Sequence, residues 1–330
     1  MKALVYTAPN EVVHRDEPDP AAGAGEVLIR VEAVGICGSD MHAFHGRDPR
    51  RVPPLILGHE LAGEILAGPG KGRRVTVNPI IACGHCEYCV QGRDNLCANR
   101  TMIGMQRPGG FAERVVTAAS AVIELPEGMG AREAALTEPA ATALHALNLA
   151  SRALVRPVPE CAVLVIGGGA IGLLTALLLR TWGARRIHLA ETNALRRDAA
   201  RRAAAVEAFD PLAGGGPPEG SMDLVIDAVG AAPTRKAALA AVKPGGVVLH
   251  IGLQDWSSEI DMRKLTLAEI TLVGAYTYST ADLRAAARAL HEGAFGDLAW
   301  VEERPLAEGA RAFDDLHHGR SAAAKILLRP

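Results

Sequence analysis

Four of the six cysteines of this 330-residue chain are crowded between positions 83 and 97. They are Cys83, Cys86, Cys89 and Cys97. Four thiolates from one short loop can close a tetrahedron around Zn²⁺ without leaving an open coordination position, which is typical of a structural site. A redox switch or a set of free thiols is the alternative. His85 lies inside the loop, and we expect it to be exposed because four thiols are already available. The spacing favours structural zinc.

A second, dispersed group of side chains could hold a catalytic metal. It consists of Cys37 in GICGSDMH, His59 and Glu60 in LGHE, and Glu138 in TEPAA. Each residue alone has an ordinary structural explanation, such as a small buried cysteine or a satisfied polar pair. Together they supply a thiolate, an imidazole and carboxylates, the ligands of a catalytic zinc that keeps one position open for substrate. Spacing alone leaves open whether positions 37, 59 and 138 meet.

A glycine-rich turn could bind a dinucleotide. Gly167, Gly169 and Gly172 follow the apolar run AVLVI and precede a Leu/Ala-rich run, which predicts strand, turn and helix. Such a turn brings a pyrophosphate to a helix N-terminus. Glu191 ends the next predicted strand, where a carboxylate can bind a ribose hydroxyl and repel a 2′-phosphate, so NAD is favoured over NADP. Arg196 could stack on adenine or weaken that preference. The alternative is a turn that only packs.

The elements that must position these residues fall into two groups. The first 140 residues contain short β-branched runs at 2–6, 26–34, 73–77 and 113–118, which predict a mostly antiparallel β domain. A helix is expected over 137–150. From Cys161 onward strands and helices alternate, which predicts an α/β fold with a doubly wound parallel sheet. After Tyr278 we expect one more helix and a final strand that returns to the first domain.

Composition excludes several other classes of protein. The formal net charge is −2, which argues against nucleic-acid binding by bulk electrostatics and against a polybasic membrane surface. The uncharged stretch 161–179 approaches the length of a membrane helix, but its glycines favour strand, turn and helix. The apolar run after Lys2 is too short for the core of a signal peptide, so a cytoplasmic location is expected.

Several motifs, taken in order, resemble one family. They are GICGSDMH, LGHELAGE, the four-cysteine loop, GGFAE, TEPAA, VIGGGAIG and DLVIDAVG. The chain resembles the zinc-dependent medium-chain dehydrogenase/reductase family of alcohol, sorbitol and threonine dehydrogenases over essentially its whole length. The resemblance implies a GroES-like catalytic domain (1–143 and 278–330) around a Rossmann NAD-binding domain (144–277), with the active site in the cleft between them.

The resemblance also implies roles for individual residues. Cys37 and His59 match catalytic zinc ligands, Glu60 matches a glutamate that can swing onto the metal, and Glu138 matches the third-ligand position. Ser39 and His42 match the groups that relay the alcohol proton to solvent, and Asp40 matches an acceptor for the second imidazole nitrogen of His59. The expected cofactor-binding residues are Gly167, Gly169, Ile171, Gly172, Glu191, Arg196 and Gly252. The expected cofactors are NAD and two zinc ions per subunit.

The resemblance predicts oxidation of a secondary alcohol by NAD, with a polyol or sugar-derived alcohol as substrate because Glu138 is typical of the sorbitol and threonine branch. An amino-alcohol oxidiser similar to threonine dehydrogenase is the alternative, and a zinc-free protein similar to quinone reductases is a further one. Thr277 stands where sorbitol dehydrogenases often have arginine, which puts a sorbitol-like substrate in doubt. The expected partner is a small-molecule alcohol substrate, and no binding to nucleic acid or membrane is expected. The chain is expected to form a homo-dimer or homo-tetramer.

Overall fold

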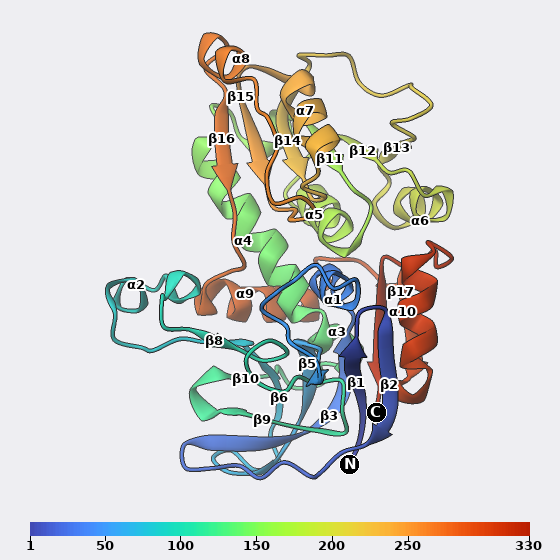
Figure 1. Ribbon diagram of the computed structural model, residues 1–330. Coiled ribbons are helices and arrows are strands. Elements are labelled where there is room, and N and C mark those ends of the chain that lie inside the picture. The colour runs from blue at the N-terminus through green and yellow to red at the C-terminus, as the bar shows by residue number, and fades with distance from the viewer.

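The computed structural model describes residues 1–330, and its chain forms two lobes (Figure 1). The lobe that contains both termini is built on a seven-stranded sheet. In spatial order its strands are β10 (Val122–Glu124), β6 (Arg74–Val77), β5 (Glu60–Ala67), β3 (Glu26–Gly35), β18 (Lys325–Arg329) and β17 (Val301–Pro305), and β9 (Arg114–Ala118) also pairs with β3. β3 alternates as predicted, because Val27, Ile29 and Val31 are buried while Arg30 is exposed.

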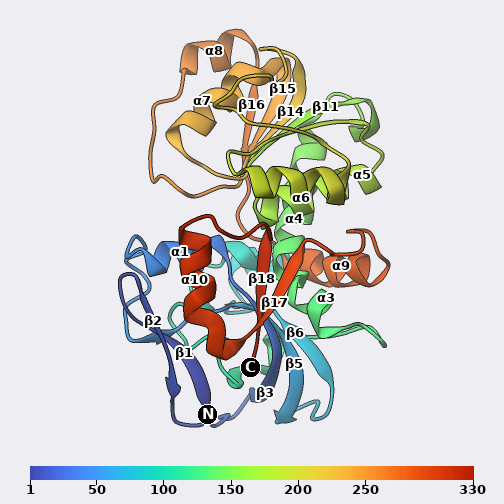
Figure 2. The ribbon, with the colours of Figure 1, turned by 90° about the vertical axis from the view of Figure 1, so that its right-hand side faces the viewer.

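Two smaller sheets and five helices complete this lobe. The sheets are β2 (Glu11–Asp16), β1 (Lys2–Ala8) and β4 (Leu55–Ile56), and the pair β7 (Ile80–Ile81) and β8 (Thr101–Met102). The helices are α1 (Gly38–Phe44), α2 (Glu87–Val90), α3 (Ala131–Ala135), α9 (Thr280–His291) and α10 (Gly309–His317). In Figure 2, α10 lies beside β17 and β18. The C-terminal segment therefore packs in the same lobe as the N-terminus.

The other lobe is a six-stranded parallel sheet with helices on both faces. In spatial order the strands are β13 (Glu207–Phe209), β12 (Arg186–Ala190), β11 (Ala162–Ile166), β14 (Met222–Asp227), β15 (Val242–His250) and β16 (Thr271–Gly274). The helices are α4 (Thr137–Ala153), α5 (Ala170–Thr181), α6 (Ala194–Ala204), α7 (Ala232–Ala241) and α8 (Met262–Leu267). This is the doubly wound strand order with a switch point between β11 and β14, where open sheets bind ligands. The predicted fold class is confirmed.

The apolar stretch 161–179 forms β11 and the first part of α5. All five residues of β11 are buried, as expected for a central parallel strand covered on both faces. None of the helices is both long enough and apolar enough to cross a bilayer. The glycines therefore mark the turn between a strand and a helix, as predicted.

The end of the chain contains more structure than expected. Between α9 and β18 lie β17 and α10, which the sequence analysis did not predict. β17 has the sequence VEERP, in which three successive charged residues replace the alternation of apolar and polar residues that usually indicates a strand. It pairs in parallel with β18, so the sheet of this lobe is not purely antiparallel. Tertiary pairing with β18 supplies the order that local sequence does not indicate.

Candidate active site

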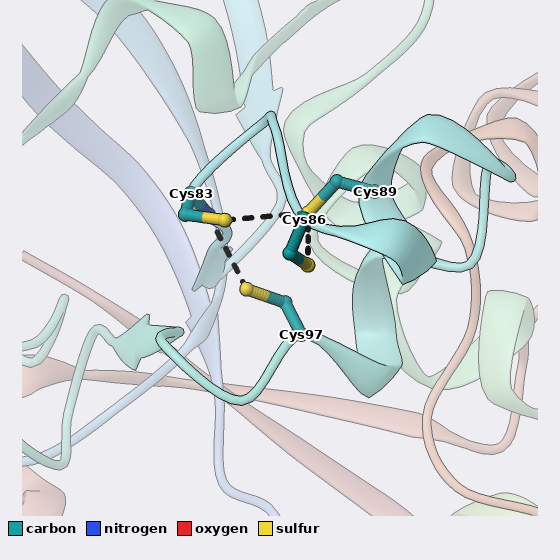
Figure 3. Close-up of side chains that lie close together, drawn as sticks. All are labelled: Cys83, Cys86, Cys89 and Cys97. Carbon is teal, nitrogen blue, oxygen red and sulfur yellow. Dashed lines mark hydrogen bonds between the residues drawn. The ribbon is translucent and has the colours of Figure 1, made fainter.

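The four clustered cysteines converge on one point (Figure 3). Sulfur–sulfur distances are 3.9 Å for Cys83–Cys89 and 3.5 Å for Cys86–Cys89, and the Cys83 amide donates to Cys97 Sγ at 3.4 Å. A tetrahedral zinc with bonds of 2.3 Å would separate sulfurs by about 3.8 Å. Backbone amides of the loop lower the pKa of Cys83 to about 6, which favours the thiolate. His85 is exposed, as expected. The donor set fits a closed Zn²⁺ site.

The four-cysteine loop is tied to a segment from the far end of the chain. Asn95, 4% exposed, donates to the Tyr276 carbonyl at 2.8 Å. The Asp94 carboxylate accepts hydrogen bonds from the amide and the hydroxyl of Thr280 at 3.1 and 2.5 Å. Tyr278, between these two contact points, donates its hydroxyl proton to Glu138 at 2.7 Å. The loop therefore supports a segment that reaches the second group of candidate ligands.

Three of the dispersed candidate ligands meet in space. The ligand atoms of Cys37, His59 and Glu60 all lie within 4.8 Å of one another. Cys37 precedes α1, while His59 and Glu60 lie at the start of β5, which pairs with β3 next to α1. His59 and Glu60 are buried. A half-buried thiol, a buried imidazole and a buried carboxylate that lie this close together fit a zinc ion.

The orientation of His59 follows from its neighbours. Nδ1 lies 3.4 Å from Asp40 Oδ1, while Nε2 lies 3.4 Å from Ser39 Oγ. Asp40 is fully buried, and its other oxygen accepts a hydrogen bond from the Cys37 amide at 3.0 Å. The imidazole thus has a carboxylate on one side and can present Nε2 to a metal, an arrangement typical of metal-binding histidines.

Glu60 has a partner that the sequence analysis missed. Lys325 Nζ donates to both carboxylate oxygens of Glu60, at 2.8 and 2.6 Å, and to the Ile36 carbonyl at 2.8 Å. Burial alone would lower the pKa of Lys325, but the charges of Glu60 and Cys37 raise it above its usual value. A lysine beginning the apolar run KILL was the available signal. Lys325 competes with a metal for Glu60.

Glu138 lies beside this group but outside the set of three. It is 6% exposed near the start of α4, and it accepts the hydrogen bond of Tyr278. Burial raises the pKa of Glu138 to about 7, while the charge of His59 opposes the shift. A buried carboxylate with this environment gains most from a cation placed next to it.

The expected relay residues, Ser39 and His42, both lie on α1 but are not hydrogen-bonded to each other. Burial lowers the pKa of His42, and the charge of Arg47 lowers it further. His42 is therefore neutral near pH 7 and able to accept a proton. A relay between the two side chains needs an intervening group, such as a water molecule or a cofactor hydroxyl.

The glycine turn has the geometry of a dinucleotide site. Gly167 has φ +102°, and a side chain on Gly172 would lie 1.9 Å from the Gly167 carbonyl oxygen. Gly169 caps the N-terminus of α5, and a Cβ there would meet nothing within 4 Å. The first and third glycines are thus required for the chain to pack, while the second leaves open space at a helix N-terminus. This matches the division of roles in a pyrophosphate-binding turn.

Glu191 lies at the end of β12 beside that turn. Its two carboxylate oxygens accept hydrogen bonds from the amides of Gly168 and Asn193, at 2.8 and 2.7 Å. An ionised carboxylate has about four acceptor positions, so capacity remains for ribose hydroxyls. Arg196 lies in the first turn of α6, and its buried Nε has no hydrogen-bond partner.

The two remaining candidate cofactor residues also lie near this edge of the sheet. Ile171, in the first turn of α5, packs against the main hydrophobic core. Gly252 follows β15, and a Cβ on it would lie 2.1 Å from the carbonyl carbon of Val229. This close approach brings together the loops that follow β14 and β15.

Known proteins share these features. Residues 23–127 match the alcohol dehydrogenase GroES-like domain, and residues 170–292 match the zinc-binding dehydrogenase family. L-galactonate-5-dehydrogenase of Escherichia coli K12 is 31% identical, over 95% of this chain and 94% of that protein. L-threonine 3-dehydrogenase of Yersinia pestis is 29% identical, over 99% of each chain.

A solved structure has the same fold along its whole length. A putative zinc-binding dehydrogenase from Sinorhizobium meliloti 1021, bound to NADP, superposes with a TM-score of 0.87 and 32% identity, covering 100% of this chain and 99% of that one. Both the sequence matches and this superposition extend over the two lobes, so the whole chain shares the architecture of these proteins. The chain belongs to the zinc-dependent medium-chain dehydrogenase family, and it is a zinc- and NAD-dependent oxidoreductase that acts on a small-molecule alcohol.

Proposed function

We propose that this enzyme oxidises a secondary hydroxyl of a polyol or sugar-derived compound, with NAD as the acceptor. The observation that carries this proposal is the group of Cys37, His59 and Glu60, whose ligand atoms lie within 4.8 Å of one another, with Glu138 beside them. A carboxylate in the ligand set is shared with the sorbitol and threonine branch of the family. The relative that acts on L-galactonate supports a sugar-derived substrate.

Cys37 and His59, with Glu138 or Glu60, would hold the catalytic zinc. When bound, this ion supplies Lewis-acid chemistry that favours the alkoxide form of an alcohol. Ser39 Oγ lies 3.4 Å from His59 Nε2, close enough to contact a substrate oxygen bound at the proposed zinc position. We therefore assign Ser39 to receive the alcohol proton. His42, kept neutral by burial, is assigned to accept that proton further out.

The cofactor is placed by the turn after β11. The amides at the start of α5 would bind the pyrophosphate, and Glu191 would bind the adenosine ribose and disfavour a 2′-phosphate. Arg196 would instead favour a 2′-phosphate, and so NADP, if its guanidinium reaches the adenosine ribose. The proposed preference is for NAD, although the solved relative from Sinorhizobium meliloti binds NADP.

A second candidate is oxidation of an amino alcohol. The relative from Yersinia pestis is an L-threonine 3-dehydrogenase. Thr277, in place of the arginine of sorbitol dehydrogenases, also moves this chain away from sorbitol itself. A parallel assay of L-threonine against sugar acids and polyols distinguishes the two substrate classes.

We further propose a division at residues 143–144 and 277–278 between the catalytic and the cofactor-binding domains. The parallel sheet lies within 162–274, which supports these positions. Zinc-bound thiolates favour a reducing compartment such as the cytoplasm. The exposed edge strand β16 favours pairing of two subunits into a homo-dimer, or into a homo-tetramer built from such dimers.

The first experiment measures zinc per subunit and NAD reduction for the wild type and for Cys37→Ser. We expect two zinc ions in the wild type and one in the variant, with turnover of a polyol or sugar acid lost. Cys161→Ser is the matched control, because Cys161 is a free cysteine outside both groups. One zinc in the wild type, unchanged by Cys37→Ser, would contradict the catalytic site.

A further inference from the structure

Arg51 is a buried cation next to the candidate catalytic metal centre. It is 3% exposed and lies in the loop between α1 and β4. Its Nη2 donates to Ser39 Oγ at 3.2 Å, its Nη1 to Asp48 at 2.6 Å, and its Nε to the Gly104 carbonyl at 3.0 Å. Ser39 Oγ in turn lies 3.4 Å from His59 Nε2. Only the Ser39 hydroxyl separates the guanidinium from a candidate zinc ligand.

The chemistry of a guanidinium fixes the direction of this hydrogen bond. Arginine has five N–H donors and no acceptor, so Ser39 Oγ must accept from Arg51. The Ser39 hydroxyl proton must therefore point elsewhere. His59 Nε2 cannot receive it once that nitrogen binds a metal. One lone pair and the proton of Ser39 remain for other partners.

The Asp48 carboxylate holds the guanidinium in place. Its side chain is 6% exposed, and it also accepts from Nε and Nη2 of Arg50, at 2.8 and 2.9 Å. Arg50, by contrast, is half exposed, and all its side-chain hydrogen bonds go to Asp48. The same carboxylate thus binds two neighbouring arginines, of which only one reaches the candidate relay. The orientation of Arg51 is set before any substrate arrives.

We propose that Arg51 is a positioning residue for alcohol oxidation, acting through Ser39. This inference rests on the proposed function. With one lone pair of Ser39 bound to Arg51, the other accepts the proton of the substrate alcohol, and the original Ser39 proton leaves toward His42 through an intervening water molecule or cofactor hydroxyl. The alcohol O–H bond breaks, a new O–H bond forms on Ser39, and the hydroxyl is regenerated. The carbinol carbon loses its hydride to NAD, so the alcohol is oxidised, NAD is reduced and one proton is released.

The competing explanation is that Arg51 only ties its loop to the backbone carbonyls of Gly104 and Ser39, the second at 3.4 Å from Nη1. In that case removing Arg51 would disturb the fold and binding at both proposed zinc sites. The resulting loss of activity would be the same whether or not the Ser39 hydroxyl is present. The proposed role predicts instead that Arg51 matters only while Ser39 is present. These two outcomes are separable by a double-mutant cycle.

The experiment compares Arg51→Gln, Ser39→Ala and the double variant with the wild type, using the polyol or sugar acid that the wild type oxidises fastest. We expect Ser39→Ala to lower kcat about 10²-fold and Arg51→Gln about tenfold, with the KM for NAD and the two zinc ions unchanged. The double variant should equal Ser39→Ala within about twofold. Arg51→Lys, which keeps a donor, should recover part of the loss.

Arg50→Gln is the matched control and should stay within about twofold of the wild type, because Arg50 binds Asp48 but not Ser39. If the fold-reductions in kcat of the two single variants multiply in the double variant, or if Arg51→Gln loses zinc, Arg51 has a purely structural role and the proposal is overturned. Unchanged kcat in Arg51→Gln would also overturn it. A wild type that binds zinc but oxidises no alcohol would refute the proposed function and the role of Arg51 together.

Discussion

Single residues set the electrostatics of the proposed reaction. The Glu60–Lys325 pair is almost fully buried, with side chains 0% and 2% exposed, so each charge depends on the other for compensation. Removing one member of a buried ion pair leaves an uncompensated charge, which is far more costly than removing both. At the proposed cofactor site a single carboxylate, Glu191, accepts hydrogen bonds from the glycine turn and is proposed to bind the adenosine ribose.

Lys325→Met should lower the free energy of unfolding by about 3 kcal/mol, because Glu60 is left buried and unpaired. Urea denaturation of the enzyme measures the change. Glu60→Gln combined with Lys325→Met removes both charges and should recover most of the loss, while Lys325→Arg should lose less than Lys325→Met. Equal destabilisation by the single and the double variant would show that the charge pair is not the cause.

Glu191→Gln should lower the ratio of kcat/KM for NAD over NADP by about tenfold, because the charge that repels a 2′-phosphate is gone. Steady-state kinetics with both cofactors measure this ratio. Glu207→Gln, on the exposed edge strand β13, serves as the control for loss of one carboxylate in the same sheet. A ratio that does not change in Glu191→Gln would move the source of selectivity to Arg196 or elsewhere.

At the scale of elements, the contact between α4 and α9 joins the cofactor lobe to the C-terminal segment. Asp282, in the first turn of α9, accepts hydrogen bonds from His145 and Asn148 of α4 at 2.8 and 3.1 Å. It also accepts from the hydroxyl of Ser279, the N-cap of the same helix, at 2.6 Å. One carboxylate therefore caps α9 and binds it to α4. Burial opposes its ionisation, but the bonds from His145 and Ser279 lower the pKa of Asp282 to about 2.

This depressed pKa defines a pH window for stability. Since the carboxylate is more acidic in the folded chain than its usual value of 3.8, its stabilising contribution is present above pH 4 and is lost as the pH falls toward 2. Asp282→Asn should therefore destabilise the enzyme by about 2 kcal/mol at neutral pH, and the difference from the wild type should shrink toward pH 2. Urea midpoints measured across this range test the window, and a difference independent of pH would contradict it.

At the scale of the whole molecule, the free edge of the parallel sheet at β16 bears on subunit assembly. This sheet ends in β13 on one side and in β16 on the other, and three of the four residues of β16 are exposed. Leu272 on β16 is 42% exposed. An edge strand with an exposed apolar residue is suited to pairing with a second subunit.

Leu272→Lys should shift the enzyme from the proposed dimer or tetramer toward smaller species, because charges on an edge strand oppose edge-to-edge pairing. Light scattering coupled to size-exclusion chromatography measures the mass. Leu212→Lys, at an exposed apolar position that follows β13 at the opposite edge of the same sheet, should leave the mass unchanged. A monomeric wild type, or a variant with the mass of the wild type, would contradict pairing through this edge.

The sequence by itself determined the features that depend on local spacing. The four cysteines, the glycine turn and the alternation of strands and helices are each contained within short segments, so their patterns predicted the four-sulfur cluster and the parallel sheet. Tertiary structure decided the rest. Cys37 meets His59 only because β3 pairs with β5, and Lys325 reaches Glu60 only because β18 pairs with β3. Such contacts depend on strand order, which no local pattern encodes, and for the same reason β17 was not foreseen.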